Sequence, residues 1–463
     1  MKCTVFTLLL AAPVLFLAGC GDDGGGGGSG GSTQGCDLAT QTGCADGLAC
    51  EEVLGGEPAC FSPVTFAGQV TNALDGAAIE GAHVVARDAN GAAVSRVAIT
   101  DAEGHYALIV PAPRDAAGAP TSAAYTLRAD AQDFAPFPAP PRVALPIDVV
   151  GAVGAPPVVD TSATDIGLLP LDDTAGLGTI RGVVVGGAAG GALVVAGALT
   201  AIADLDGAYS LFNVPAGDAS VTAYAAGSNY TPATATVKAD LETAGIDLVE
   251  NGDATATLSG KLEIVNGGGA GETSVVLAVE STYLDALGRG EVPKGLRVGG
   301  TSGDFTLTGV PAGSYVVLAA FENDGLVRDP DTSIGGTDTL KVTLTPGQTL
   351  AAGSFKVTGA LAVLAPGAAS VVGLESVSAP PTFSWEDDSS EDEYLVRVHD
   401  ALGHLVWETS GNFDPGGSKP VTLPYAGDPL IPGMIYQFRA VSMKDGVPIS
   451  ATEDLLGVFA YAP

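Results

Sequence analysis

The fold is decided by a motif that is fullest in residues 302–315, where Ser302-Gly303-Asp304-Phe305-Thr306-Leu307 is followed closely by Val310-Pro311-Ala312-Gly313-Ser314-Tyr315. An acidic residue beside glycine supplies a tight turn, because glycine adopts positive φ without a steric penalty. Phe305 and Leu307 are two positions apart, so on a strand both side chains point to one face, which we expect to be buried. The Pro-Ala-Gly segment makes the next turn, and a β-rich run follows it. The motif therefore predicts a β-hairpin at the edge of a core.

The same pattern occurs twice more upstream. Residues 100–108 carry Asp101, Gly104, Tyr106 and Leu108, and residues 204–211 carry Asp204, Gly207, Tyr209 and Leu211. Each copy is preceded by a strand of the form apolar-x-Gly-x-apolar, at residues 66–70, 180–184 and 258–262. Short strands separated by Gly and Pro at this spacing predict small antiparallel β-sandwiches in tandem.

This repeated run resembles the carboxypeptidase regulatory-like domain, a seven-stranded prealbumin-like sandwich. The resemblance covers residues 64–358 and divides them into three units, at residues 64–172, 178–250 and 254–360. In the first unit, residues 111–123 replace the short Pro-Ala-Gly turn, and a Pro/Ala-rich stretch at residues 136–157 delays the last strand. The resemblance implies accessory modules that pack beside enzymes, tile surface proteins or bind carbohydrate, and it does not imply peptidase activity.

Residues 365–463 show a different pattern and form the fourth predicted domain. Residues 383–385 read as a strand with a buried indole, and Tyr394, Val396 and Val398 alternate onto one face of another strand. Further strands are expected at residues 405–407 and 458–461. Residues 430–441 resemble the Leu-x-Pro-Gly-x-x-Tyr stretch of fibronectin type III domains. That resemblance implies a tyrosine corner in which Tyr436 buries its ring and bonds the backbone of the preceding turn.

The N-terminus predicts export and lipidation. A short apolar run after Lys2 ends in Leu17-Ala18-Gly19-Cys20, which resembles the bacterial lipobox. The resemblance implies a lipoprotein signal peptide at residues 1–19 and a lipid on Cys20; the alternative is an ordinary signal peptide with a chance cysteine. Residues 20–35 are a Gly-rich, flexible tether. Because Gly21 rather than aspartate follows Cys20, the resemblance implies the outer membrane of a Gram-negative bacterium, with the covalent lipid as the membrane contact.

Four further cysteines lie within a short segment at residues 36–63, namely Cys36, Cys44, Cys50 and Cys60. Outside the cytoplasm such a cluster predicts two disulfides, and three pairings are open. A zinc site is the rival interpretation, which the absence of a Cys-x-x-Cys pair disfavours. The segment is too small to bury a core and needs these covalent links to be ordered.

Composition and motifs argue against nucleic-acid binding and catalysis. The net charge is −34, from 53 acidic and 19 basic residues, so the basic footprint that phosphate binding needs is missing. None of the four histidines, His83, His105, His399 and His404, has a partner at metal-ligand spacing, and we expect each to face solvent. No serine-hydrolase elbow occurs. We therefore predict no enzyme, no catalytic residue and no cofactor.

Calcium binding stays open at three acidic segments. These are residues 204–207, the group Asp324, Asp329 and Asp331, and residues 386–393. All offer the oxygen ligands that Ca²⁺ prefers, but none shows the complete twelve-residue calcium loop with its closing glutamate. We assign no metal site.

The sequence thus predicts an all-β protein of tandem sandwiches behind a signal peptide, a tether and a disulfide-bonded segment. Its expected function is non-enzymatic: a lipid-anchored envelope protein with a binding, structural or adhesive role toward a cell-surface protein or glycan. The alternative is a carbohydrate-binding lipoprotein of a polysaccharide-use system, for which Tyr224, Tyr230 and Trp407 are the candidates for an exposed aromatic platform.

Overall fold

The computed structural model describes residues 35–38, 40–265, 267, 271–319, 325–331, 339–388, 390–413 and 420–463. The predicted signal peptide, Cys20 and the tether up to residue 34 lie outside these ranges. The described residues are almost entirely β-structure, with two single-turn 3-10 helices at Val149–Gly151 and Glu280–Thr282. Among them, no helix has the length and apolarity needed to cross a membrane. The all-β prediction is confirmed.

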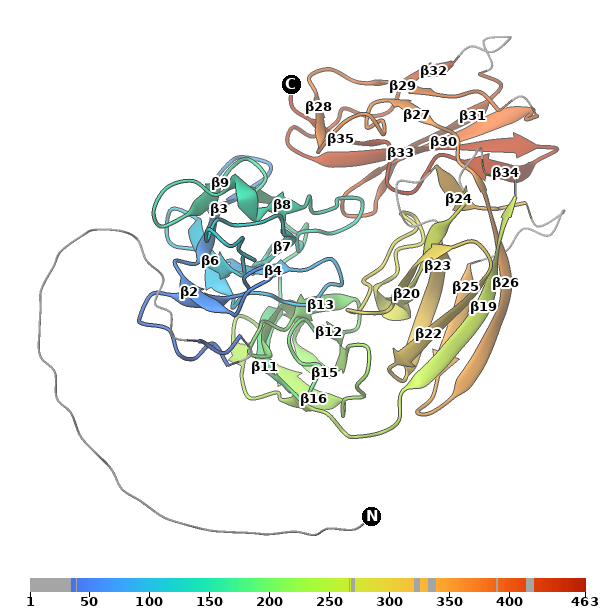
Figure 1. Ribbon diagram of the computed structural model, residues 1–463. Helices are drawn as coiled ribbons and strands as arrows, with labels where there is room; N and C mark the ends of the chain where they lie inside the picture. Colours follow the sequence, from blue (N-terminus) through green and yellow to red (C-terminus); the bar gives the residue numbers. More distant parts are fainter. Residues whose placement is uncertain are drawn as a thin grey trace, which may run out of the picture.

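The strands form four sandwiches, which we number 1 to 4 along the chain (Figure 1). One sheet of sandwich 1 contains β3 (Val64–Asn72), β6 (His105–Val110), β9 (Val158–Asp160) and β10 (Ile166–Leu168). The other contains β4 (His83–Arg87), β5 (Ala98–Ile99), β7 (Ala124–Asp130) and β8 (Ile147–Asp148).

Sandwiches 2 and 3 repeat this arrangement. In sandwich 2 one sheet contains β11 (Leu177–Val185), β14 (Ala208–Pro215), β17 (Glu242–Thr243) and β18 (Leu248–Val249). The other contains β12 (Leu193–Ala196), β13 (Leu199–Ile202), β15 (Gly217–Tyr224) and β16 (Ala233–Val237). In sandwich 3 one sheet contains β19 (Ala256–Val265), β22 (Asp304–Val310), β24 (Leu326–Arg328) and β26 (Thr349–Gly359). The other contains β20 (Thr273–Val279), β21 (Arg297–Thr301), β23 (Gly313–Ala319) and β25 (Leu340–Leu344).

Strand order shows that the three units share one arrangement, to which sandwich 3 adds the edge strand β24. In each, the opening strand pairs antiparallel with the strand that carries the aromatic residue of the motif, and parallel with the closing strands of the unit. The second sheet has the order β5-β4-β7-β8 in sandwich 1, β13-β12-β15-β16 in sandwich 2 and β21-β20-β23-β25 in sandwich 3. The sheets are otherwise antiparallel, as predicted.

The side chains predicted to face a core are buried. Tyr106 and Leu108 belong to the core of sandwich 1, Tyr209 and Leu211 to that of sandwich 2, and Phe305 and Leu307 to that of sandwich 3. In each sandwich the repeated glycine is the residue directly opposite the aromatic one: Gly68 faces Tyr106, Gly182 faces Tyr209, and Gly260 faces Phe305. An added Cβ would meet the Phe305 ring at Gly260, and the carbonyl oxygens of Thr164 and Ile246 at Gly68 and Gly182, so glycine leaves room for these close approaches.

Sandwich 4 differs in strand order. A three-stranded sheet of β27 (Val363–Ala365), β29 (Thr382–Trp385) and β32 (Val421–Pro424) packs on a larger one. The larger sheet contains β28 (Glu375–Val377), β30 (Glu393–Asp400), β31 (Leu405–Gly411), β33 (Ile435–Lys444), β34 (Val447–Ala451) and β35 (Val458–Tyr461). Trp385, Tyr394, Val396 and Val398 are fully buried in its core, as predicted. The Tyr436 ring is buried, and its hydroxyl accepts a hydrogen bond from the Ile431 N–H at 2.8 Å.

The cysteine segment carries the two predicted disulfides, which join Cys36 to Cys50 and Cys44 to Cys60. Cys50 and Cys60 face each other across the two-stranded sheet of β1 (Ala49–Glu51) and β2 (Ala59–Phe61), yet each bonds a cysteine outside it. The segment packs on sandwich 1 through Arg114, which forms a buried ion pair with Glu51 and donates to the Ser62 carbonyl at 2.9 Å. Arg114 belongs to residues 111–123, the stretch that distinguishes the first unit.

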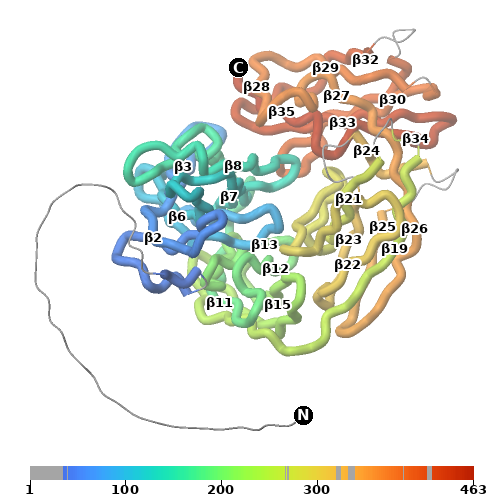
Figure 2. The backbone as a smooth tube through the Cα atoms, in the orientation of Figure 1, coloured from blue at the N-terminus to red at the C-terminus, as the bar shows by residue number. Residues whose placement is uncertain are grey.

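The four sandwiches are folded back on one another (Figure 1), and the backbone trace shows the same closed arrangement (Figure 2). Sandwiches 1 and 2 are joined by the Asp133 N–H, which donates to Asn213 Oδ1 at 2.6 Å. Sandwiches 2 and 3 are joined by Asn229, whose Oδ1 accepts from the Ala312 N–H at 2.7 Å. Leu169 of the chain leaving sandwich 1 lies in the core cluster of sandwich 4. The chain therefore forms a compact body rather than an extended string.

Candidate binding cleft between sandwiches 3 and 4

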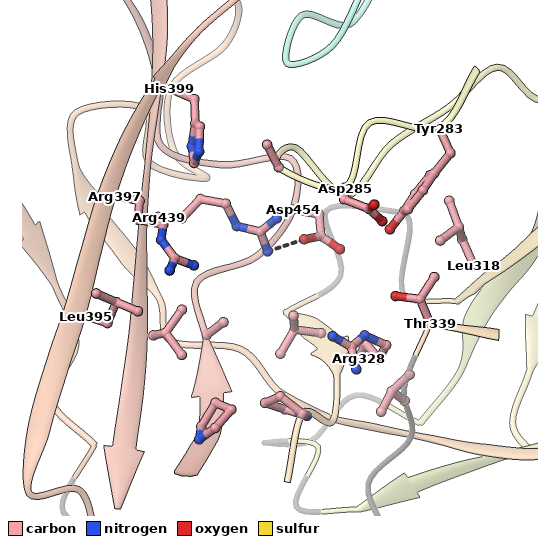
Figure 3. A pocket seen from close by; sticks show the side chains of 18 of the residues that line it. Tyr283, Asp285, Leu318, Arg328, Thr339, Leu395, Arg397, His399, Arg439 and Asp454 are labelled. Carbon is pink, nitrogen blue, oxygen red and sulfur yellow. Dashed lines mark hydrogen bonds and ion pairs between the residues drawn. The ribbon is translucent and has the colours of Figure 1, made fainter. Parts of the chain in front are cut away.

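A cavity of about 700 Å³ lies between sandwich 3 and sandwich 4 (Figure 3). Its volume is within the range of small-molecule sites in proteins. Another cavity, of about 70 Å³, lies between sandwiches 1 and 2 and has room for little more than ordered water. The larger cavity is therefore the candidate site.

The sandwich 3 wall of the cleft is apolar. Its lining includes Val317 of β23, Val327 of β24, Leu340 of β25, and Phe355 and Val357 of β26. β23 and β25 belong to one sheet, whereas β24 and β26 belong to the other. Since β24 and β25 are the edge strands of their sheets, the cleft reaches between the two sheets at the open edge of the sandwich.

The sandwich 4 wall carries charge on an otherwise apolar sheet face. Leu395 and Arg397 project from β30, and Arg439 and Val441 project from β33. Arg397 and Arg439 are directly opposite each other in the β30–β33 register, where like charges repel. Each has one acidic partner: Arg397 Nε lies 2.7 Å from Glu408 Oε2, and Arg439 pairs with Asp454.

His399 continues the same face of β30, two positions after Arg397. The residue is 6% exposed, and its Nδ1 has no hydrogen-bond partner among the described residues. Burial lowers the pKa of His399, and the charges of Arg397 and Arg439 lower it further. The imidazole is therefore neutral at pH 7, beside two arginines whose effect on it is opposed in part by Asp400 and Glu408.

The rest of the polar lining comes largely from loops and edges of sandwich 3, including Tyr283, Asp285, Arg328 and Thr339 (Figure 3). Three arginines and three carboxylates line the cleft, whereas acidic residues outnumber basic ones by 53 to 19 in the whole chain. The charged groups that line the cleft are thus balanced in number, unlike those of the chain as a whole.

The histidine prediction is half right. His105 and His404 are exposed, as expected. His399 is buried in the cleft, and His83 is half-buried with its ring edge-on to Phe212 of sandwich 2, 5.0 Å between centroids. Both departures have one cause, because each residue faces away from its own core and is covered by a neighbouring sandwich.

The predicted aromatic platform is not present. Tyr230 is buried in the core of sandwich 2. Tyr224 is partly buried and packs edge-on against Tyr315 of sandwich 3, and the Trp407 ring packs against Phe383 and Tyr425. These side chains stabilise the cores and an interface instead of offering a flat sugar-binding surface.

The acidic segments are engaged with the protein. Asp204 accepts hydrogen bonds from the N–H groups of Asp206 and Ala208 in its own turn, and from Val97 of sandwich 1. In residues 386–393, Asp388 accepts from the Ser442 hydroxyl at 2.9 Å. Asp324 lies outside the described residues. Among the described residues, the one group of three potential metal ligands is Cys36, Cys44 and Cys50, which are all in disulfides.

The cleft residues were not predicted from the sequence. The available signal was that Leu395, Arg397 and His399 occupy the positions opposite the inward Tyr394, Val396 and Val398. This outward face of the strand carries one positive and one titratable side chain, whereas most charged residues of the protein are acidic, so it differs from an ordinary solvent-exposed face. The partner surface on sandwich 3 cannot be read from that alternation.

No protein-family model matches the sequence, and no curated protein matches it. Similar solved structures include the TIE protein of Bacillus anthracis, at 12% identity over 82% of this chain and 66% of that chain, with a TM-score of 0.16. GBS52, the minor pilin of Streptococcus agalactiae, is 14% identical over 36% and 70% of the two chains, with a TM-score of 0.18. BcpA, the major pilin subunit of Bacillus cereus, is 10% identical over 64% and 99%, with a TM-score of 0.15. With TM-scores this low, we draw no conclusion about this chain from these similarities.

Proposed function

We propose that this chain is a non-enzymatic, lipid-anchored protein of the cell envelope, whose four sandwiches act as one rigid body in a structural or adhesive role. The observation that carries the proposal is Arg128 of β7, whose side chain is completely buried where three sandwiches meet. Its Nη1 lies 3.3 Å from Glu291 Oε1 of sandwich 3, and its Nη2 donates to the Thr200 carbonyl of sandwich 2 at 2.9 Å. A bidentate pair with Asp130 uses Nε and a second donor of Nη2.

A buried guanidinium is tolerated only where its donors are satisfied, because desolvation of an unpaired charge is expensive. Burial on its own would lower the pKa of Arg128, but Asp130 and Glu291 outweigh it and raise the pKa, so the charge is retained. The partners of Arg128 come from three sandwiches. They are satisfied together in a single relative arrangement, which favours a rigid body over independently moving modules.

Arg289 joins a second set of sandwiches in the same way. This residue of sandwich 3 is 3% exposed and donates through Nη1 to the Pro141 carbonyl of sandwich 1 at 3.1 Å. Its Nη2 donates to the Asp454 carbonyl of sandwich 4. Together, Arg128 and Arg289 connect all four sandwiches through buried charge-assisted hydrogen bonds. Such a body suits a protein that presents a fixed surface or bears load.

The proposal also assigns a domain family to each sandwich. The parallel pairing of first and last strands in sandwiches 1 to 3 supports the carboxypeptidase regulatory-like interpretation. Sandwiches 1 and 2 have seven strand positions when β9/β10 and β17/β18 are each counted as one interrupted strand, and sandwich 3 has β24 in addition. The packing of a three-stranded sheet on a six-stranded one in sandwich 4, and the Tyr436 hydroxyl bonded to Ile431, support the fibronectin type III-like interpretation. The lipid anchor rests on residues 17–20 and on the disulfide-bonded segment that follows them, because disulfides indicate an oxidising compartment.

The anchor and the location are tested together in the native host. Cells grown with an alkyne fatty acid should label the wild-type protein and not the Cys20→Ser variant, and the label should fractionate with the outer membrane. Protease added to intact cells should remove the labelled protein if it faces outward. A labelled Cys20→Ser protein, or wild-type protein recovered unlabelled from the culture medium, contradicts the proposal.

A further inference from the structure

We propose that the cleft between sandwiches 3 and 4 binds a long-chain carboxylate, with the aliphatic chain against the sandwich 3 wall and the carboxylate at Arg397. This binding activity goes beyond the structural role above and does not depend on it. Three properties of the cleft carry the inference: the composition of its deep wall, the free donors at its charged end, and the balance of charge in its lining.

The deep wall matches an aliphatic chain. Val317, Val327 and Val357 are buried side chains from both sheets of sandwich 3, and Leu395 and Val441 face them from sandwich 4. The lining is mostly aliphatic, and each methylene moved from water into such a site contributes about 0.8 kcal/mol. A glycan would need aromatic faces in this position, and the lining has few of them.

The charged end of the cleft offers hydrogen-bond donors to a ligand. Arg397 uses Nε for Glu408, while its two Nη atoms have no hydrogen-bond partner among the described residues. Figure 3 shows the guanidinium groups of Arg397 and Arg439 close together below His399, with the Arg439 group directed at Asp454. The paired Nη donors of an arginine match the two oxygens of a carboxylate in a bidentate arrangement. A bound carboxylate would also relieve the repulsion between two arginines that are opposite each other in the sheet.

The charge balance selects a monoanion. Asp285, Glu408 and Asp454 equal the three arginines of the lining in number, so a monoanion leaves one excess negative charge in a partly enclosed site, whereas a dianion leaves two. A cationic head would lie beside Arg397 and Arg439, and these like charges would repel it. A single carboxylate is therefore the head group that fits best.

The test uses the full-length Cys20→Ser protein, so that no covalent lipid competes, and measures binding by isothermal titration calorimetry. The probes are laurate, dodecan-1-ol and dodecyltrimethylammonium, each below its micelle concentration. We expect laurate to bind with a stoichiometry of one and at least tenfold more tightly than either of the other two. Absence of laurate binding, or equal affinity for the three probes, would overturn the proposal.

Variants then locate the site. Arg397→Gln should weaken laurate at least tenfold and leave dodecan-1-ol unchanged; because this side chain is 44% exposed, the fold should tolerate the change. Leu395→Trp, which places bulk in the cleft from a half-buried position, should weaken laurate and dodecan-1-ol alike. Arg181→Gln is the matched control, since Arg181 forms a similarly exposed ion pair with Glu242 on sandwich 2 and should leave all affinities unchanged. Thermal melts confirm that each variant is folded. Undiminished laurate binding in both folded cleft variants would place the ligand elsewhere and refute the assignment.

Discussion

Tyr209 lies directly opposite Gly182 in the β11–β14 pair, and its hydroxyl donates a hydrogen bond to the carbonyl oxygen of Ile246 at 2.6 Å. Ile246 belongs to the closing segment of sandwich 2, which the tyrosine thereby ties to the opening strand. The same relationship holds in sandwich 1, where Tyr106 lies opposite Gly68 and bonds the Thr164 carbonyl at 2.6 Å. In sandwiches 1 and 2 the repeated glycine and the tyrosine opposite it thus act together to hold the closing segment against the opening strand.

The first prediction concerns that glycine. A Cβ atom at Gly182 would lie 1.9 Å from the Ile246 carbonyl oxygen, a backbone atom that cannot swing away. Gly182→Ala should therefore lower the free energy of unfolding by about 3 kcal/mol or more, measured by urea denaturation. Gly187→Ala in the same sandwich is the control, because no atom lies within 4 Å of its Cβ position, and it should be close to neutral. Equal effects of the two changes would show that the close approach is not what requires glycine.

The tyrosine corner of sandwich 4 supplies the second prediction. Tyr436→Phe keeps the ring stacked on Phe459 but leaves the Ile431 N–H without its acceptor, so about 1 kcal/mol should be lost. Tyr436→Ala also creates a cavity and should lose about 3–5 kcal/mol. Calorimetric melts of the whole chain measure both values. A neutral Tyr436→Ala would refute the corner, because a merely exposed strand tyrosine tolerates that change within about 0.5 kcal/mol.

The third prediction concerns the docking of the cysteine segment. The side chains of Arg114 and Glu51 are 5% and 2% exposed, and burial raises the pKa of Glu51 while Arg114 opposes the rise. Arg114→Ala leaves a buried carboxylate without its partner, a change that costs about 3–5 kcal/mol in comparable pairs. The disulfides keep the segment itself intact, so we expect it to detach from sandwich 1 as a unit, seen as faster hydrogen exchange in β1 and β2. Arg96→Ala, which removes an exposed ion pair with Asp206, should change neither property.

What could be predicted from the sequence was the part of the fold that is local to one sandwich. Phe305 and Leu307, or Tyr394 and Val396, announce their burial by alternating with polar neighbours, because a strand has a period of two. The glycine turns and the Pro-Gly turn before Tyr436 are also local signals. These patterns depend on the immediate chain neighbours and hold wherever the sandwich is placed.

What could not be predicted depends on how the sandwiches pack together. Alternation assigns Arg128, His83 and His399 to outward faces, and all three point away from their own cores. Each is nevertheless covered by a different sandwich, a contact between residues far apart in the chain. The cleft is of the same kind, since its walls come from two sandwiches. The disulfide pairing was open for a related reason: Cys50 and Cys60 are cross-strand neighbours and still bond other partners.

The fourth prediction is a pH dependence that originates at the interface of sandwiches 1 and 2. Burial against Phe212, with a smaller contribution from Arg181, lowers the pKa of His83 to about 4, against about 6.5 in the unfolded chain. Between these values the unfolded state binds the proton more tightly, so stability falls as the pH drops from 7 to 5. Between pH 7 and pH 5, the wild type should therefore lose up to about 2 kcal/mol more of its free energy of unfolding than the His83→Phe variant loses. Urea melts of both proteins at pH 7, 6 and 5 measure it, and parallel pH profiles would show that His83 protonates freely in the folded protein.

The last prediction tests the rigid body through Arg128. Arg128→Met keeps much of the side-chain volume but removes the charge that pairs with Asp130 and Glu291, whose side chains are only 13% and 21% exposed. Breaking a buried pair from one side costs about 3–5 kcal/mol, because the remaining charges lose their compensation. This loss falls on the interfaces and not on the cores, so the sandwiches should separate before they unfold. We expect calorimetry to show one transition for the wild type and several for the variant. Small-angle scattering should show a larger radius of gyration for the variant at temperatures below its first transition.

Arg128→Met combined with Glu291→Gln should recover part of the loss, since fewer uncompensated charges remain. Arg181→Met, which removes an exposed pair, is the control and should stay within about 0.5 kcal/mol of wild type. If Arg128→Met instead lowers the stability of sandwich 1 alone and leaves the radius of gyration unchanged, Arg128 is a core residue of one sandwich and the four do not depend on it for their arrangement.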